Sequence, residues 1–190
     1  MLDEGIAVAT ISLIIHVTAA VILVGPQVLM FFAVVPASWL IEDDERLKRA
    51  VVGVVARRFG ILAAIALVLL LVTGLYQYVA VIPQAIRQAP DSRFAAIFAV
   101  KMLLFTLLIG LIYVHTYRYA RRIAALSDQV IALERDPSAE RREAGRARAD
   151  ELERTRQRSF AFSALILATS LLTLWFGVAL GQEVTAWAQR

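Results

Sequence analysis

Four long stretches of the chain are almost free of charged side chains. They cover about residues 8–36, 59–86, 94–117 and 159–182, and Lys101 is the only charged residue inside them. Each is long enough to cross the hydrocarbon core of a bilayer, which takes ~20 residues of helix. None alternates apolar and polar residues as the strands of a membrane barrel do. The pattern therefore predicts an all-α integral membrane protein, a bundle of four transmembrane helices in a lipid bilayer.

The charged segment 118–158 lies between the third and fourth stretches and has a helical pattern of its own. Its first half carries one apolar stripe at spacings of three and four, and after Asp136-Pro137-Ser138 its second half offers carboxylate–arginine pairs at helical spacing. The stripe and the pairs are Ile123, Leu126, Val130 and Leu133, then Glu143/Arg146, Asp150/Arg154 and Glu153/Arg156. We expect helices three and four to extend into the cytoplasm as an antiparallel helical hairpin. This hairpin is either a solvated spacer or a docking platform for a protein partner.

The basic residues predict the orientation of the chain. Of its 20 lysines and arginines, 16 lie in segments 42–58 and 118–158 and three on the opposite side of the predicted membrane. Because Lys and Arg are concentrated in cytoplasmic loops, both segments are expected in the cytoplasm and both termini outside. The location that fits is a bacterial-type inner (cytoplasmic) membrane.

The overall composition excludes several classes of protein. With 59% hydrophobic residues, 19% charged residues and no cysteine, the chain is no ordinary soluble domain, disulfide scaffold or thiolate metal site. The arginine-rich segment 118–158 lacks the interleaved aromatic residues of a nucleic-acid site and adjoins the membrane. We therefore expect no nucleic-acid partner.

Function must come from the few polar side chains within the apolar stretches, because each is costly there. With each stretch centred on the bilayer, His16 lies ~10 Å outward of the centre, and Gln77 and Lys101 lie ~7 Å outward. These three side chains, from three helices, are expected in one layer. His115 falls ~14 Å on the inner side, so the two histidines are ~24 Å apart in depth and cannot both ligate one haem iron.

Each of these residues has a structural and a functional interpretation. His16 is either a hydrogen-bonded core imidazole, an axial ligand of haem or metal, or a proton relay. Lys101 either extends to the outer interface or faces the bundle as a ligand or counter-charge. Gln77 suits a hydrogen bond between helices or a ligand contact, and His115 suits the interface. The Gly177-x-x-x-Gly181 motif permits close helix packing, within the chain or in a homodimer.

Several of these residues also carry a resemblance. The run from His16 to Gly25 resembles the first helix of copper-resistance protein D (CopD-like) membrane domains, and Thr73-Gly74 resembles the Thr-Gly motif of their second helix. Lys101 matches the lysine that opens their third helix. The superfamily includes the HemJ-type protoporphyrinogen oxidases, in which a first-helix His and a third-helix Lys are linked to haem binding. In that group the first-helix glycine is followed by an aromatic-rich stretch that ends in Pro-Arg. This chain departs from the pattern, since Gly25 is followed by Pro26-Gln27-Val28-Leu29-Met30 and no arginine lies there.

The resemblance and the predicted layer together imply a b-type haem-binding membrane protein with an electron-transfer or porphyrin redox role. His16 would ligate the iron of haem b, and Lys101 and Gln77 would complete the cofactor site. If the protein is an enzyme, it is an oxidoreductase. One alternative is transport of copper or another metal ion along His16, Gln77 and Met102. The other is a non-catalytic accessory subunit of a membrane complex, docked through the hairpin.

Overall fold

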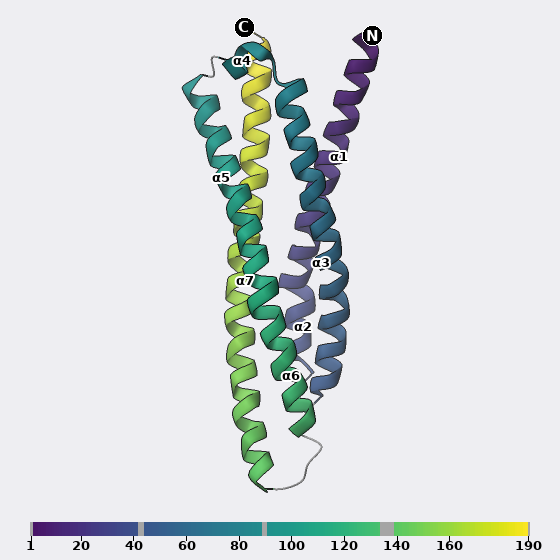
Figure 1. Ribbon diagram of the computed structural model, residues 1–190, viewed down its shortest axis with the longest axis vertical. Coiled ribbons are helices and arrows are strands. Elements are labelled where there is room, and N and C mark those ends of the chain that lie inside the picture. The colour runs from purple at the N-terminus through teal and green to yellow at the C-terminus, as the bar shows by residue number, and fades with distance from the viewer. Residues whose placement is uncertain (1, 42–43, 89–90, 134–138, 190) are drawn as a thin grey trace. The chain divides into compact units, whose positions relative to one another are not determined.

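The computed structural model describes residues 2–41, 44–88, 91–133 and 139–189, and in these residues all regular structure is helical. Four long helices dominate the chain (Figure 1). The first comprises α1 (Leu2–Leu29), the π-helix η1 (Met30–Val34) and α2 (Val35–Trp39), and the second comprises α3 (Glu45–Tyr76) and η2 (Gln77–Val81). The short α4 (Gln84–Gln88) follows. The third comprises α5 (Ser92–Val114), η3 (His115–Ala120) and α6 (Arg121–Leu133), and the fourth is α7 (Ala139–Ala188).

Each long helix is apolar and long enough to cross a membrane, which confirms the predicted class. The candidate spans are Gly5–Trp39, Glu45–Val81, Ser92–Leu133 and Glu143–Trp187. In the most apolar part of each span, no more than 28% of the residues are buried inside the protein. Large side chains such as Ile14, Val72 and Leu103 instead point outward, with 59–69% of their surface exposed. Such an outer surface is stable in lipid and not in water.

The helices extend beyond the charge-free stretches, because polar residues at their ends also form helix. Helix α3 begins at Glu45, well before the predicted start at residue 59. The Asp44 carboxylate accepts a hydrogen bond from the Leu47 backbone amide at 2.9 Å, which is the contact of a helix N-cap. The arginines and lysine of residues 46–58 then continue the helix, since straight-chain side chains lose little rotamer freedom in it.

The chain divides into two compact units, and each long helix contributes a segment to both. The first unit comprises Met1–Pro26, Gly60–Leu108 and Thr169–Arg190. Near α4 its core is a cluster of Ile86, Phe94 and Leu180, with Ile82, Ile97, Phe98 and Val184 packed against it. An ion pair between Arg93 and Glu183, 2.9 Å long, joins α5 to α7 at this end.

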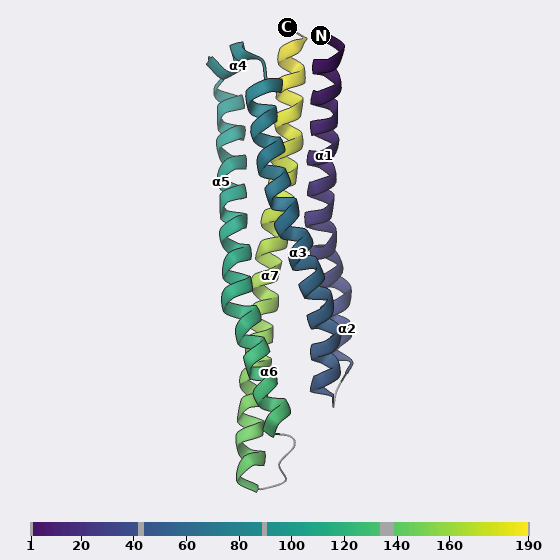
Figure 2. The same ribbon diagram turned by 45° about the vertical axis from the view of Figure 1, so that its right-hand side comes forward.

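The second unit, Gln27–Phe59 and Ile109–Ala168, contains the predicted hairpin. Helix α6 and the first half of α7 run side by side in both ribbon views (Figure 2). The predicted apolar stripe is confirmed as the contact between them, because Leu126 and Val130 pack with Leu152 of α7. The stripe is thus covered by the chain's own helix. The predicted break at Asp136-Pro137-Ser138 lies outside the described residues.

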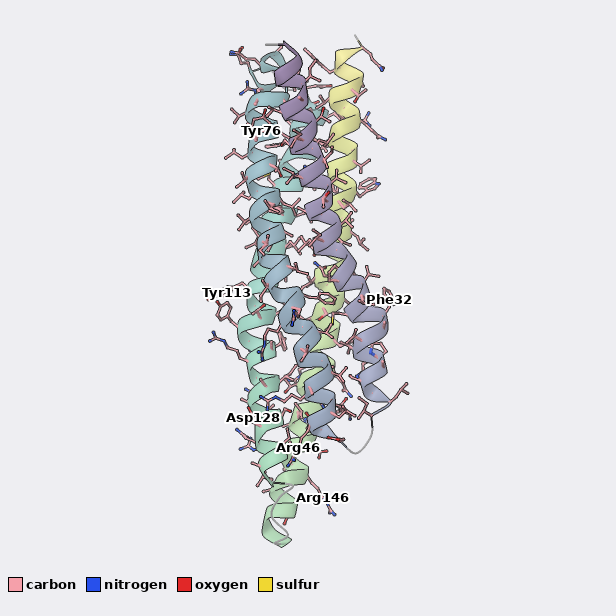
Figure 3. All side chains as sticks on the ribbon, turned by 90° about the vertical axis from the view of Figure 1, so that its right-hand side faces the viewer. Phe32, Arg46, Tyr76, Tyr113, Asp128 and Arg146 are labelled. Carbon is pink, nitrogen blue, oxygen red and sulfur yellow. The ribbon has the colours of Figure 1, made fainter. Side chains whose placement is uncertain are left out.

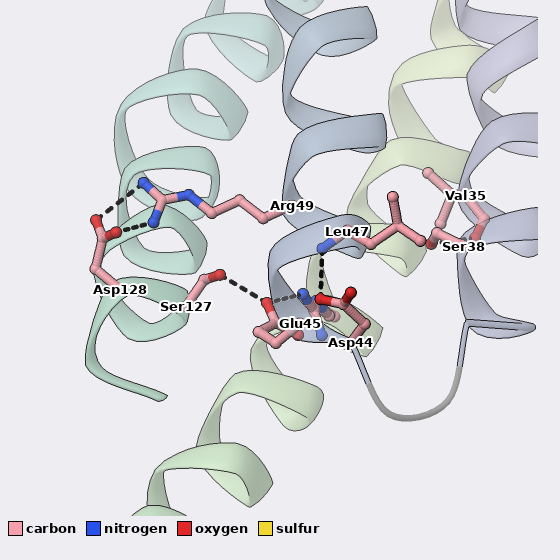
Figure 4. A network of polar contacts seen from close by, with 9 residues as sticks. Val35, Ser38, Asp44, Glu45, Leu47, Arg49, Ser127 and Asp128 are labelled. Carbon is pink, nitrogen blue, oxygen red and sulfur yellow. Dashed lines mark hydrogen bonds and ion pairs between the residues drawn. The ribbon is translucent and has the colours of Figure 1, made fainter. Parts of the chain in front are cut away.

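The start of α3 is bound to this hairpin by a polar network (Figure 4). Glu45 accepts hydrogen bonds of 2.6 Å from the Ser127 hydroxyl and from the Arg156 guanidinium, and Arg49 forms an ion pair with Asp128. The expected pairing of Arg156 with Glu153 is therefore wrong. Arg156 binds Glu45, whose carboxylate is only 9% exposed and thus depends more on a cationic partner than an exposed one does.

Candidate functional site

His16 lies on α1 in the first unit, and its ring is held by Thr73 of α3. Nδ1 of His16 is 2.7 Å from the Thr73 hydroxyl oxygen, and that hydroxyl is 2.5 Å from the Leu69 carbonyl oxygen one turn earlier. A hydroxyl has one hydrogen, and the Leu69 carbonyl can only accept it. The Thr73 oxygen must therefore accept from His16, which places the imidazole proton on Nδ1 and leaves a free lone pair on Nε2.

Gly74, beside Thr73, allows the imidazole to lie directly against α3. A Cβ atom on Gly74 would come within 3.3 Å of Cε1 of His16, closer than most carbon contacts allow. The Thr73-Gly74 pair thus has two roles toward one ring. Threonine binds Nδ1, and glycine leaves space for the ring edge.

Lys101 faces the interior of the first unit. A Cβ atom on Gly177 of α7 would touch its Cε at 3.7 Å and its Nζ at 3.8 Å, so the lysine side chain lies over this glycine. Lys101 is also near enough to His16 for the two side chains to interact electrostatically. Within the described part of the chain, no carboxylate forms an ion pair with Lys101. Its positive charge is thus available to an anionic partner.

Gln77 lies one helical turn beyond Thr73 and makes a contact between helices. Its amide nitrogen donates to the backbone carbonyl of Ser12 at 3.5 Å. Ser12 itself precedes His16 by one turn of α1, is 8% exposed, and its hydroxyl has no hydrogen-bond partner among the described residues. The structure therefore groups Gln77 with Ser12, and groups His16 with Thr73 and Lys101.

Sequence reasoning did not include Ser12 and Thr73 among the candidate site residues. Both lie four residues from one that it did include, since Ser12 precedes His16 and Thr73 precedes Gln77 by one turn. For Ser12 the available signal was the i, i+4 spacing on a helix face, and for Thr73 it was also the Thr73-Gly74 motif. Neither signal shows that the α1 face with Ser12 and His16 packs against the face of the second long helix with Thr73 and Gln77.

His115 belongs to the second unit, where α7 binds its ring. Nε2 lies 3.1 Å from the hydroxyl oxygens of both Ser159 and Ser163, and the Phe162 ring stacks on the imidazole at 6.3 Å. The imidazole thus packs against its own chain, and its expected depth near the membrane interface stays a prediction. Each histidine thus has its own hydroxyl partners in its own unit.

The small-residue motif of α7 is only partly a packing contact. Gly177 lies against Lys101, whereas a Cβ atom on Gly181 would meet nothing within 4 Å.

No group of three or more His, Cys, Asp or Glu side chains able to hold a metal ion occurs among the described residues.

Comparison with known proteins identifies the family. The family model described as Copper resistance protein D (CopD) matches residues 53–176, roughly two thirds of the chain. The match contains Thr73, Gly74, Lys101 and His115, and His16 precedes it. No curated protein and no solved structure matches the chain. By the extent of the family match, this multi-pass membrane protein belongs to the copper resistance protein D family.

Proposed function

We propose that this protein binds a b-type haem at His16 and takes part in electron transfer or porphyrin redox chemistry. The observation that carries the proposal is the hydrogen bond from His16 Nδ1 to Thr73. A ligating histidine normally donates its other ring N–H to a fixed acceptor, which sets the tautomer and the ring orientation. His16 has this arrangement, with Nε2 left as the ligand atom.

Haem fits the available residues better than a bare metal ion does. A porphyrin supplies four nitrogen ligands, so one imidazole from the protein is sufficient. A bare copper ion held by protein alone needs several side-chain ligands, and the described residues contain no cluster of three or more such acids, thiols or imidazoles. Two further polar groups would gain a partner from a bound group: the Ser12 hydroxyl, one turn before His16 and without a partner among the described residues, and Lys101, without an ion pair there.

In this proposal each residue has a defined role. Thr73 and Gly74 orient the imidazole, and Lys101 binds a haem carboxylate or, when deprotonated, supplies a second ligand. Gln77, the first residue of η2, holds the second long helix to α1 one turn away through its contact with Ser12. Haem, when bound, supplies a one-electron iron couple, and the apolar residues around the unit limit the access of water to it.

An absorption spectrum of the purified protein, oxidised and reduced with dithionite, tests the proposal. We expect a Soret band that His16→Ala removes. His115→Ala is the matched control, since it deletes the only other imidazole of the chain, and it should leave the band intact. A protein without a Soret band after loading with haem, or a full band in His16→Ala, contradicts the proposal. Loss of the band in His115→Ala alone assigns the ligand to the second unit.

Transport of copper is the second candidate, and the printed description of the family favours it. The route would pass His16 and Gln77. Met102, the third residue expected on this route, is 40% exposed on the outer surface. It would therefore contribute less than His16 and Gln77 to a route through the interior. Uptake of labelled copper into proteoliposomes above the protein-free control would support this function, and uptake equal to the control would remove it.

A further inference from the structure

Two exposed tyrosines and an arginine form a continuous stripe in the second unit, which we call the Tyr113–Arg121 stripe. The rings of Tyr113 and Tyr117 lie 4.4 Å apart, and the guanidinium carbon of Arg121 is 4.5 Å from the centre of the Tyr117 ring. The tyrosines are 61% and 47% exposed. Figure 3 shows Tyr113 pointing away from the helices. The stripe therefore faces the surroundings of the protein and not its core.

The stripe lies where the third helix leaves the apolar layer. The charge-free part of this helix ends at Tyr117, and Arg118 is the first charged residue after it. Tyrosine is enriched at this depth, since its ring suits the acyl boundary and its hydroxyl suits the headgroups. An arginine one turn further out is then level with the lipid phosphates.

Further arginines lie at the same depth on the neighbouring helix. The Arg49–Asp128 ion pair sets the register between α3 and α6. From this pair, Arg57 is ~12 Å along α3, and Tyr117 is ~16 Å along the third helix in the same direction. Arg57 and Arg58 are exposed and add to the positive potential at this level.

Arg121 of the stripe and the neighbouring Arg118 differ from other arginines of this unit in their ion pairs. Arg49, Arg122 and Arg156 are each paired with a carboxylate. In the part of the chain that the structure describes, Arg118 and Arg121 form no such pair. Arginine binds phosphate with a planar fork of N–H donors, and basic clusters beside membrane helices attract anionic lipids. The positive charge of Arg118 and Arg121 and their depth at the membrane surface thus both suit the phosphate of an anionic lipid.

We propose that the Tyr113–Arg121 stripe binds the headgroup of an anionic phospholipid. The phosphate accepts hydrogen bonds from Arg121, which the Tyr117 ring holds in place, and Arg118 adds a second positive charge. The two tyrosine rings line the upper part of the acyl chains. This site is separate from the proposed haem site and does not depend on it.

Native mass spectrometry of the full-length protein in neutral detergent tests this inference. We expect phosphatidylglycerol to be retained in preference to phosphatidylcholine with the same acyl chains. Arg121→Gln should weaken that retention about fivefold, and Arg121→Lys should weaken it less, because the charge remains. Arg146→Gln is the matched control. It removes an equal charge from an exposed position of the hairpin (Figure 3) and should retain the lipid as the parent does.

Three outcomes would overturn the inference. Equal retention of the two lipids excludes recognition of the anionic headgroup. Equal loss in Arg121→Gln and Arg146→Gln indicates a general effect of net charge. Binding of inorganic phosphate that depends on Arg121, without a preference for the anionic lipid, assigns the site to the free ion. Circular dichroism of each variant checks that its helices are intact.

Discussion

Nδ1 of His16 lies 2.7 Å from the hydroxyl oxygen of Thr73, a residue 57 positions later in the chain. The Thr73 hydroxyl gives its own proton to the Leu69 carbonyl, 2.5 Å away. A backbone carbonyl of α3 thereby determines which nitrogen of a ring on α1 carries the proton. The lone pair on Nε2 is a consequence of how two helices pack.

Replacing Thr73 with valine should change the tautomer of His16. Valine keeps the branched shape of threonine and removes the acceptor for Nδ1–H, so the free imidazole becomes a mixture of tautomers. Nitrogen-15 NMR of histidine-labelled protein without haem measures this directly. His115, the only other histidine, provides an internal reference.

Two further substitutions control this experiment. Thr73→Ser keeps a hydroxyl and should keep the Nδ1–H form. Thr106→Val removes a hydroxyl that also bonds to the carbonyl one turn earlier, at 2.9 Å, but is exposed, and should leave His16 unchanged. A His16 signal that does not respond to Thr73→Val would show that the hydrogen bond does not set the tautomer.

Alanine at Gly74 should destabilise the protein, whereas alanine at Gly110 should stabilise it. The new methyl group at residue 74 meets Cε1 of His16 at 3.3 Å, and at residue 110 it meets nothing within 4 Å. In a helix, alanine is favoured over glycine by ~1 kcal/mol, while overpacking costs about 1–3 kcal/mol. Unfolding of both variants in mixed micelles measures the difference, and equal gains in stability would contradict the tight contact at Gly74.

Glu45→Gln should weaken the attachment of α3 to the hairpin. The substitution leaves Arg156, which is 21% exposed, without its anionic partner, and we expect a loss of about 2 kcal/mol or more. Asp128→Asn is the comparison, because its pair with Arg49 is 63% exposed on the aspartate side and should contribute less than ~1 kcal/mol. Hydrogen exchange of α6 amides reports both losses, and similar losses would show that burial of Glu45 is unimportant.

The hairpin should lose stability in acid because of Glu151. Hydrogen bonds from Arg122 and then Arg148, 2.6 and 2.8 Å long, lower the pKa of this carboxyl below its usual 4.5. A lowered pKa in the folded state means that the contribution is fully present above pH 4.5. It is lost as the pH falls through the folded-state value.

Hydrogen exchange of α6 amides against pH measures this effect. Glu151→Gln should remove the part of the pH dependence that belongs to this carboxyl. An identical pH profile in the variant would mean that the two arginines do not act on Glu151 in the folded hairpin.

The orientation of the chain can be tested with single cysteines, because the parent has none. Ala147 in the hairpin and Gln189 near the C-terminus are both exposed. If the basic segments face the cytoplasm, a membrane-impermeant maleimide labels Gln189→Cys in intact spheroplasts and Ala147→Cys only after lysis. The reverse pattern would show the opposite orientation.

The sequence alone determined the class of the protein and the hairpin. Charge-free stretches of sufficient length identify transmembrane helices, because the bilayer sets both their length and their composition. The apolar residues from Ile123 to Leu133 could also be predicted to form a packing contact, since an apolar face on a polar helix in water must be covered. Leu152 of α7 covers it.

The tertiary structure decided which side chains meet. Within lipid a helix is apolar on every face, so its pattern carries no periodicity that shows which face turns inward. Depth along the helix axis placed His16 and Lys101 in one layer, but rotation about that axis determines that His16 meets Thr73 and that Lys101 meets Gly177. The Glu45–Arg156 pair joins residues 111 positions apart. Spacing along one helix therefore could not predict it, because such a contact depends on how separate helices pack.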